Sequence, residues 1–335
     1  ARERPLNPID ARAQPGAPPA AAARQNLIQV ENLTKWFPLS RGFLHELFGR
    51  QQRAYLKAVD GVSFSIGEGE VLGLAGESGC GKSTTGMTLL KLYEPTGGAI
   101  RFRGENLAAI RDWRRLKVFR RNVQIVFQNP YESLNPRLAV YQSVREPIAI
   151  HFEGDEDFYF EKVRAALERA GLKPPEIYLE RYPHELSGGQ LQRVAIARAI
   201  GVEPRFLVAD EPVSMLDVSI RAGILNLLRY FTRELEMGIL YISHDLSTMK
   251  QVCTTVGVMY LGKIVEIGAT DAILHDPKHP YAQALVAAIP AMRGDGQRKR
   301  IHLEGAVPNP IDMPSGCRFH PRCPAVMPRC RSEEP

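Results

Sequence analysis

Short apolar segments recur along the chain, and several of them end at a glycine turn or a polar side chain. Residues 71–75 (VLGLA), 206–210 (FLVAD) and 239–243 (ILYIS) have the length and composition of strands that are buried on both faces. Residues 27–30 and 56–66 are also predicted strands, and the second alternates apolar and polar positions. The pattern therefore predicts a sheet with a buried core.

Apolar residues at helical spacing occur between these strands. They are found in residues 84–92, 161–171 and 191–200, and residues 140–150 also look helical. Residues 140–150 and 161–171 form a helical block between sheet elements. Strands and helices in this order predict an α/β fold.

The two ends of the chain and its cysteines carry weaker signals. Residues 1–25 are rich in Ala, Pro and Arg without an apolar period, so we expect an extended or disordered lead-in. A loop-like insertion is predicted for residues 35–55. No apolar run approaches the roughly 18 to 20 residues that cross a bilayer, and the first residues lack the pattern of an export signal. Five cysteines are too few for a disulfide framework in a chain of this length, which favours a reducing cytosol.

The charge balance alone assigns no partner. The 335 residues are 44% hydrophobic, with a net charge of +6 and a pI near 9.1. Such a balance permits contact with nucleic acid, anionic lipid or nucleotide phosphates. The densest basic run, residues 111–121 (RDWRRLKVFRR), is compatible with a solvated helix face beside the core, a contact with a membrane subunit, or a nucleic-acid patch.

The sharpest chemical signal is GESGCGKS at residues 76–83, which fits G-x-x-x-x-G-K-[ST] without a mismatch between a predicted strand and a predicted helix. Glycines let the backbone wrap a polyphosphate, and the amides and dipole of the helix N-terminus favour its charge. We expect Lys82 to reach the β- and γ-phosphates and Ser83 to bind Mg2+. The residues assigned to this phosphate site are Gly76, Glu77, Ser78, Gly79, Cys80, Gly81, Lys82, Ser83 and Thr84.

Other predicted strands end in side chains suited to phosphoryl transfer. Asp210 is expected to hold Mg2+ through water, and Glu211 to polarise the water that attacks the γ-phosphate. His244 follows another buried strand, and its place at the same sheet edge favours a γ-phosphate contact over a purely structural role. Gln128 ends a strand of the same kind and is expected to touch both Mg2+ and the attacking water.

A second glycine turn, Ser187, Gly188, Gly189 and Gln190, leads directly into the helix predicted for residues 191–200. It provides a second helix N-terminus for an anion. One phosphate loop is enough for simple nucleotide binding, so the duplication predicts two chains packed head to tail. Each signature turn would then close over the ATP held by the other chain. Asp217, before a further predicted helix, is either an N-cap or a dimer-interface residue.

Two further groups of residues leave alternatives open. Phe37 and Tyr55 are candidates to stack on an adenine ring, and both are equally suited to core packing. Near the end of the chain, Cys317, Cys323 and Cys330 have the spacing C-x5-C-x6-C. Three soft ligands suggest a metal or iron–sulfur site, with free thiols as the alternative because three ligands are not four.

With the phosphate loop, Gln128, the LSGGQ turn, the Asp210 and Glu211 pair and His244 in this order, the chain resembles the ATPase subunits of ATP-binding-cassette (ABC) transporters. The resemblance covers about residues 27–330. Three stretches look like the oligopeptide/dipeptide importer ATPases: QNPYESLNPR at 128–137, HPYAQAL at 279–285 and GCRFHPRCP at 316–324. The first of these looks most like the second of the two paired ATPase subunits.

The resemblance implies a P-loop NTPase fold and its cofactors. An ABC-type nucleotide-binding domain would occupy residues 27–270 after a disordered segment at 1–26, with a helical subdomain inserted at about 130–203 and an extension at 271–335. ATP and Mg2+ are the implied cofactors. In this family the terminal cysteines can hold a [4Fe-4S] cluster together with a fourth cysteine a little further on, whereas this sequence stops at residue 335.

The resemblance also implies partners: a second ABC ATPase subunit, two transmembrane permease subunits and an external solute-binding protein, at the cytoplasmic face of the inner membrane. Closure of the ATPase dimer would drive alternating access, and hydrolysis would reset it. The ATPase never touches the solute, so peptides, nickel, opines and oligosaccharides stay open. A soluble ABC ATPase acting on nucleic acid or ribosomes is the main alternative, and an exporter or regulatory ATPase is another. The sequence shows no second cassette, coiled-coil insertion or zinc module of the kind typical of the soluble class.

Overall fold

A six-stranded sheet lies at the centre of the fold and has the strand order β10-β9-β3-β8-β7-β6. The computed structural model describes residues 26–39, 54–289 and 305–334. Strands β3 to β9 of this sheet pair in parallel, and β10 pairs antiparallel with β9. The strands are β3 (Val71–Ala75), β6 (Val123–Val126), β7 (Phe206–Asp210), β8 (Gly238–Ser243), β9 (Thr255–Tyr260) and β10 (Lys263–Ala269). Because the parallel strands share one carboxyl edge, the side chains that follow β3, β6, β7 and β8 converge there.

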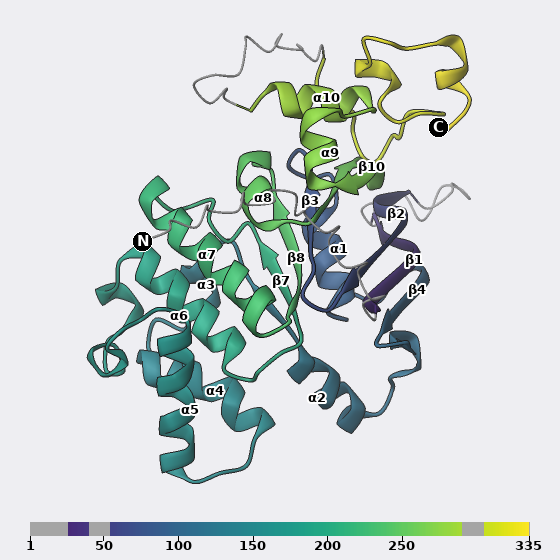
Figure 1. Cartoon of the computed structure of the whole chain (residues 1–335). Helices are drawn as coiled ribbons and strands as arrows, with labels where there is room; N and C mark the ends of the chain where they lie inside the picture. The colour runs from purple at the N-terminus through teal and green to yellow at the C-terminus, as the bar shows by residue number, and fades with distance from the viewer. Residues whose placement is uncertain (1–25, 40–53, 290–304, 335) are drawn as a thin grey trace, which may run out of the picture.

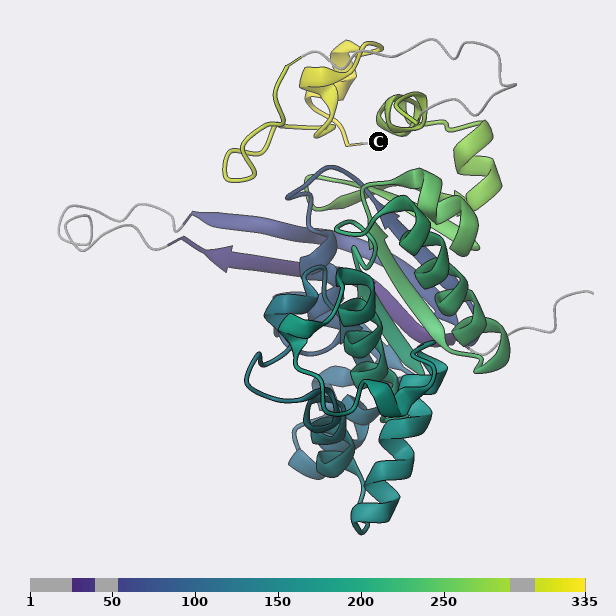
Figure 2. The ribbon, with the colours of Figure 1, turned by 90° about the vertical axis from the view of Figure 1, so that its left-hand side faces the viewer.

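A second, antiparallel sheet of four strands has the order β2-β1-β4-β5. Its strands are β1 (Asn26–Pro38), β2 (Tyr55–Gly67), β4 (Gly97–Phe102) and β5 (Glu105–Asn106). Figure 2 shows β1 and β2 as a long ribbon that extends away from the body of the molecule. The predicted insertion at residues 35–55 is therefore shorter, since residues 35–38 still pair with β2. Its remainder, residues 40–53, and the predicted lead-in at 1–25 fall outside the described residues.

Helices cover the central sheet and form a lobe beyond it (Figure 1). Around the sheet are α1 (Lys82–Leu89), α2 (Trp113–Asn122), α7 (Val218–Glu234), α8 (Leu246–Val252), α9 (Thr270–His275) and α10 (Pro280–Ala287). The lobe contains α3 (Pro130–Ser133), α4 (Val140–His151), α5 (Glu156–Arg169) and α6 (Gly188–Ile200). None of the helices in the described part of the chain is long and apolar enough to cross a membrane.

Two apolar clusters hold these layers together. One joins the central sheet to the helical lobe, and the other fills the space between the two sheets around α1. The helix predicted for residues 161–171 begins five residues earlier, at Glu156, because Asp155 caps it by accepting a hydrogen bond from the Phe158 amide at 2.9 Å. The predicted α/β architecture is confirmed, and the helical block lies where the pattern puts it.

Candidate nucleotide-binding and hydrolysis site

The predicted phosphate loop connects β3 to α1 and needs its glycines. A Cβ at Gly76 would lie 2.2 Å from the Met259 carbonyl oxygen, and one at Gly81 would lie 2.1 Å from that of Ala58. Gly81 also has a φ of 110°, which favours glycine. No side chain caps α1 within the described residues, so its first amides are available to a phosphate.

Lys82 is folded back onto this loop. Its Nζ donates to the carbonyl oxygens of Gly76 at 2.8 Å and Glu77 at 2.9 Å, and the residue is only 6% exposed. Cys80 Sγ lies 3.8 Å from the same nitrogen, and burial raises the pKa of this thiol. The ammonium group is thus held at the loop by neutral oxygens, which a phosphate would replace with charged ones.

The residues predicted to act on the attacking water meet at the Glu211 carboxylate. Gln128 Nε2 donates to Oε2 at 3.2 Å, and His244 Nδ1 lies 3.1 Å from Oε1. Glu211 itself has a φ of 46°, an uncommon backbone conformation for this residue type, and its amide donates to the Ile242 carbonyl at 2.9 Å. The three side chains come from the ends of β6, β7 and β8, as the parallel sheet requires.

The predicted magnesium ligands are also adjacent. Asp210 is buried at the end of β7, and burial raises the pKa of its carboxyl, while a hydrogen bond with the Ser83 hydroxyl opposes that rise. A hydroxyl, a carboxylate and the nearby Gln128 amide are oxygen donors of the kind that Mg2+ prefers. The residues present therefore fit a magnesium ion at this sheet edge.

A cavity of about 420 Å³ lies between the loop and these side chains, with Lys82, Ser83, Thr84, Gln128 and Glu211 in its wall. Phe37 also lines it, and its ring packs edge-on against Tyr93 with centroids 5.4 Å apart. Tyr55 is not among the lining residues and packs against Trp36 instead, at 6.3 Å. Of the two adenine candidates, the structure places only Phe37 at the cavity.

The signature turn lies outside this cavity. Ser187 and Gln190 form a capping box on α6: the Ser187 amide donates to Gln190 Oε1 at 3.0 Å, and the Gln190 amide donates to Ser187 Oγ at 3.3 Å. Gly189 packs closely on the start of α7, because a Cβ there would lie 2.6 Å from Ile220. Asp217 holds the N-cap position of α7, but its side chain caps none of the described amides.

The comparisons with known proteins agree with this geometry. Residues 59–214 match the family described as ABC transporter, and residues 265–330 match the family described as oligopeptide/dipeptide transporter, C-terminal region. The chain is 44% identical over 317 residues to the oligopeptide transport ATP-binding protein AppF of Bacillus subtilis (strain 168), covering 94% of each chain. It is 43% identical over 315 residues to the dipeptide transport ATP-binding protein DppF of Escherichia coli (strain K12), covering 94% of this chain and 92% of that one.

The chain belongs to the ABC transporter ATP-binding proteins of the oligopeptide/dipeptide type.

Solved structures of ABC cassettes share the fold. The dimeric post-hydrolysis state of the cassette MJ0796 bound to ADP and Pi aligns with a TM-score of 0.62 at 26% identity, covering 72% of this chain and 98% of that one. CbiO1 from Clostridium perfringens aligns with a TM-score of 0.63 at 28% identity, covering 75% and 92%. The predictions of an ABC-type nucleotide-binding fold, of ATP hydrolysis and of a peptide-importer ATPase are confirmed.

The iron–sulfur prediction receives no such support in this ABC ATPase. Within the described residues no group of three His, Cys, Asp or Glu side chains is arranged to hold a metal ion. Cys317, Cys323 and Cys330 form no disulfide bond, and the Cys317 amide donates to the Cys330 carbonyl at 2.9 Å. Burial raises the pKa of the Cys323 thiol.

Sequence reasoning missed two residues that contact the phosphate loop from the C-terminal side. The Tyr281 hydroxyl accepts from the Glu77 amide at 2.9 Å, and Arg322 donates to the Glu77 carboxylate at 2.8 and 3.1 Å. Both lie in stretches that the sequence used only for the family resemblance. No local spacing signals a contact between residues separated by 204 and 245 positions.

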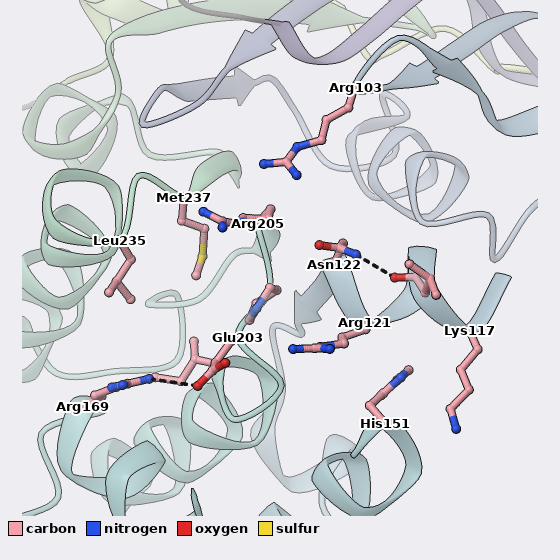
Figure 3. A pocket seen from close by; sticks show the side chains of 13 residues that line it. Arg103, Lys117, Arg121, Asn122, His151, Arg169, Glu203, Arg205, Leu235 and Met237 are labelled. Atoms are coloured by element: carbon pink, nitrogen blue, oxygen red, sulfur yellow. Dashed lines mark hydrogen bonds and ion pairs between the residues drawn. The ribbon is translucent and has the colours of Figure 1, made fainter. Parts of the chain in front are cut away.

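Figure 3 shows a separate basic groove, which is lined in part by residues of the basic run at 111–121. It is a cavity of about 640 Å³ lined by Arg103, Lys117, Arg121, His151, Arg169, Glu203 and Arg205, among others. Several of its charges already have partners: Arg103 pairs with Glu68 at 2.6 Å and Arg169 with Glu203 at 3.9 Å. None of the predicted nucleotide residues lines it, and Trp113, at the start of this run, is 64% exposed. These features fit the solvated-face interpretation of the run.

Proposed function

We propose that Glu211 orients the attacking water in this ATP-hydrolysing subunit of a peptide importer. The observation that carries the proposal is the convergence of Gln128 and His244 on the Glu211 carboxylate, which follows the buried Asp210 and shares a cavity wall with Ser83. This is the set of groups that γ-phosphoryl transfer to water needs at one place.

The chain's residues divide the work of hydrolysis. The loop amides and Lys82 bind the phosphates, and Ser83 and Asp210 would hold Mg2+. The ion, when bound, neutralises charge on the phosphate oxygens. The Glu211 carboxylate accepts a hydrogen bond from the water and aligns it, while Gln128 and His244 fix the position of that carboxylate.

We further propose that a second ABC chain completes the site by placing its signature turn over the nucleotide. Ser187, Gly188 and Gly189 lie outside the cavity of their own chain, so they are available to another. The Ser187 hydroxyl can donate to a phosphate oxygen while its oxygen accepts the Gln190 amide. The similar cassette MJ0796, which is dimeric in a post-hydrolysis state bound to ADP and Pi, is consistent with this arrangement. Asp217, next to the same surface, is then an interface residue.

The membrane partners follow from the same family membership. We propose two transmembrane permease subunits, a second ABC ATPase and an external solute-binding protein, with this chain at the cytoplasmic face of the membrane. Tyr131, three residues after Gln128, is 57% exposed on α3 and offers an aromatic contact for a permease subunit. Such a contact would link the permease to the Gln128 and Glu211 hydrogen bond.

Extraction of the full-length protein from membranes in mild detergent, without oxygen, tests this proposal. Mass spectrometry of the purified complex should find two polytopic membrane subunits and a second ABC ATPase. Recovery in the soluble fraction with nucleic acid or ribosomes would overturn it in favour of the soluble class. Iron and acid-labile sulfide measured in the same preparation test the iron–sulfur prediction, and absence of both would leave the terminal cysteines as thiols.

A further inference from the structure

Every polar group of Glu77, the second residue of the phosphate loop, is held by another residue. Its amide donates to the Tyr281 hydroxyl at 2.9 Å, and its carbonyl accepts from Lys82 Nζ at 2.9 Å. Its two carboxylate oxygens accept from the two terminal nitrogens of Arg322 at 2.8 and 3.1 Å. Glu77, which binds the Lys82 ammonium group, is thus also hydrogen-bonded by residues from the C-terminal part of the chain.

The two side chains that hydrogen-bond Glu77 from the C-terminal side are buried. The Arg322 side chain is 7% exposed and Tyr281 is fully buried. A bidentate arginine–carboxylate pair is directional and strong, and an arginine with so little contact with water depends on its partner for charge compensation. The hydrogen bonds with Glu77 accordingly raise the pKa of Arg322. The arginine is therefore shielded from water, while the Glu77 side chain is 29% exposed.

The segment that carries Arg322 is itself fixed to the central sheet. Phe319 packs against Tyr260 at 5.3 Å and against Tyr281 at 5.4 Å, and those two tyrosines pack on each other at 4.7 Å. Arg318 pairs with Asp60 and donates to a backbone carbonyl, with 8% of its side chain exposed. Residues 305–334 therefore form a docked extension, drawn in yellow beside α10 in Figure 1, at the far end from the helical lobe.

The docked extension also reaches the cavities around the loop. Pro310 lines the nucleotide cavity together with Gly79 and Lys82. An adjoining cavity of about 220 Å³ has Glu77 and Ser78 on one side and residues 307–310 on the other. The docked extension is thus in contact with the phosphate loop through the Arg322 side chain and at the cavity wall, while Tyr281 of α10 binds the loop backbone.

We propose that Arg322 and Tyr281 are positioning residues for ATP, so that the docked extension is a working part of the nucleotide site. They hold the Glu77 peptide, and through it the loop amides and Lys82, in the geometry that phosphates require. A loop ordered in advance loses less free energy when it binds its ligand. The proposal rests on the ATP site proposed above, and it concerns affinity rather than chemistry because Arg322 and Tyr281 make no hydrogen bond to Gln128, Glu211 or His244.

The test compares ATP binding and hydrolysis by the assembled complex for Arg322→Gln, Tyr281→Phe and a matched control. Loss of a buried charged hydrogen bond predicts a rise of about tenfold in the Kd and KM for ATP with Arg322→Gln, and kcat within about twofold. Tyr281→Phe, which removes one neutral hydrogen bond, should raise both by about threefold. Arg329→Gln, an exposed arginine of the same extension, should change neither.

A double-mutant cycle separates positioning from general damage. If Arg322 acts through Glu77, then Glu77→Gln alone and Glu77→Gln with Arg322→Gln should show the same KM as Arg322→Gln, because all three remove one interaction. Arg322→Lys, which keeps the charge and folds with least change, should give an intermediate KM. Additive effects, a fall in kcat that matches the rise in KM, or an equal response from Arg329→Gln would overturn the proposal.

No hydrolysis by the unaltered complex would contradict the proposed function. Unchanged equilibrium affinity for ATP in Arg322→Gln would contradict only the role of the docked extension.

Discussion

The phosphate loop and the signature turn are both glycine turns at a helix N-terminus, yet the chain surrounds them very differently. Helix α1 begins without a side-chain cap, whereas α6 begins with the reciprocal Ser187 and Gln190 box. The phosphate loop opens on a cavity that also contains Gln128 and Glu211, and the signature turn lies outside it. The phosphate loop therefore has most of a nucleotide site around it within its own chain. The signature turn has no such surroundings and offers only one surface to a nucleotide.

The comparison teaches that a helix N-terminus becomes a nucleotide site only through what converges on it. Positive charge is not the deciding feature either, since the basic groove has more cationic side chains than the nucleotide cavity. In that groove, ion pairs such as Arg169 with Glu203 already use part of the charge. At the phosphate loop, the backbone amides and Lys82 lie beside a cavity that Gln128 and Glu211 also line.

The largest expected effect is the loss of ATP binding in Lys82→Ala. Removing a charged donor to the phosphates should weaken the affinity of the chain for ATP by about 100-fold or more, measured by titration calorimetry. Lys117→Ala, in the basic groove, should leave the affinity within about twofold. Equal losses in both variants would show that charge density, rather than the loop, binds the nucleotide.

Ser187→Asp sharpens the contrast between the two turns. Asp caps a helix as well as Ser does, so α6 should keep its stability, but its charge would face the γ-phosphate held by the other chain. Hydrolysis by the assembled complex should fall about 10- to 100-fold, while ATP binding by the isolated chain stays unchanged. Ser187→Asn, a neutral cap, should lose less activity. Loss of ATP affinity in the isolated Ser187→Asp chain would place the signature turn in its own site and refute the shared-site proposal.

A smaller effect distinguishes the two adenine candidates. Phe37 lines the nucleotide cavity and Tyr55 does not, so Phe37→Ala should weaken ATP binding by about three- to tenfold through loss of a stacking contact. Tyr55→Ala should have an effect below about twofold. Fluorescent nucleotide titration of both variants measures the difference, and the reverse order would assign the stacking role to Tyr55.

The smallest expected effect is a pH dependence of stability at α10, the helix that contacts the phosphate loop through Tyr281. The signature turn has no corresponding contact among those described above. His279 Nδ1 accepts from the Tyr281 amide at 3.1 Å and caps α10, and burial lowers the pKa of this histidine below its ordinary 6.5, against an opposing influence of Glu266. The unfolded chain therefore takes up the proton first as pH falls below 6.5. The free energy of unfolding should therefore decrease as pH falls from 6.5 through the folded pKa.

His279→Asn isolates that contribution, because Asn also caps a helix but does not titrate. Thermal unfolding of both proteins at pH 7.5 and 5.5 should show a smaller pH-dependent change in Tm for the variant. An equal change would assign the acid sensitivity to other groups.

Most of the candidate site could be predicted from the sequence because each proposed catalytic group lies at, or one or two residues after, the end of a buried strand. Parallel strands bring such positions together without any knowledge of distant contacts, and Gln128, Asp210, Glu211 and His244 all meet at one edge for that reason. The hydrophobic pattern of the sequence could not show which of Phe37 and Tyr55 lies at the nucleotide cavity. That depends on the register of β1 on β2, which places Phe37 opposite Leu56.

The docked extension marks where prediction from the sequence stopped. Arg322 and Tyr281 carry no motif for a phosphate-loop contact. Both reach Glu77 from segments that pack around Tyr260, the last residue of β9. Contacts of this kind depend on tertiary packing between distant segments. The cysteine spacing in the same extension suggested a metal, yet the described residues show no group arranged to hold one.

The most direct test of the central claim, that this chain hydrolyses ATP at Glu211, is vanadate trapping in the assembled complex. Radiolabelled 8-azido-ATP is turned over with vanadate, cross-linked by light, and the subunits are separated by electrophoresis. This chain should carry trapped label in the unaltered complex, and Glu211→Gln should lose the trapped label while still binding ATP without turnover. Equal trapping on this chain in Glu211→Gln would contradict the account.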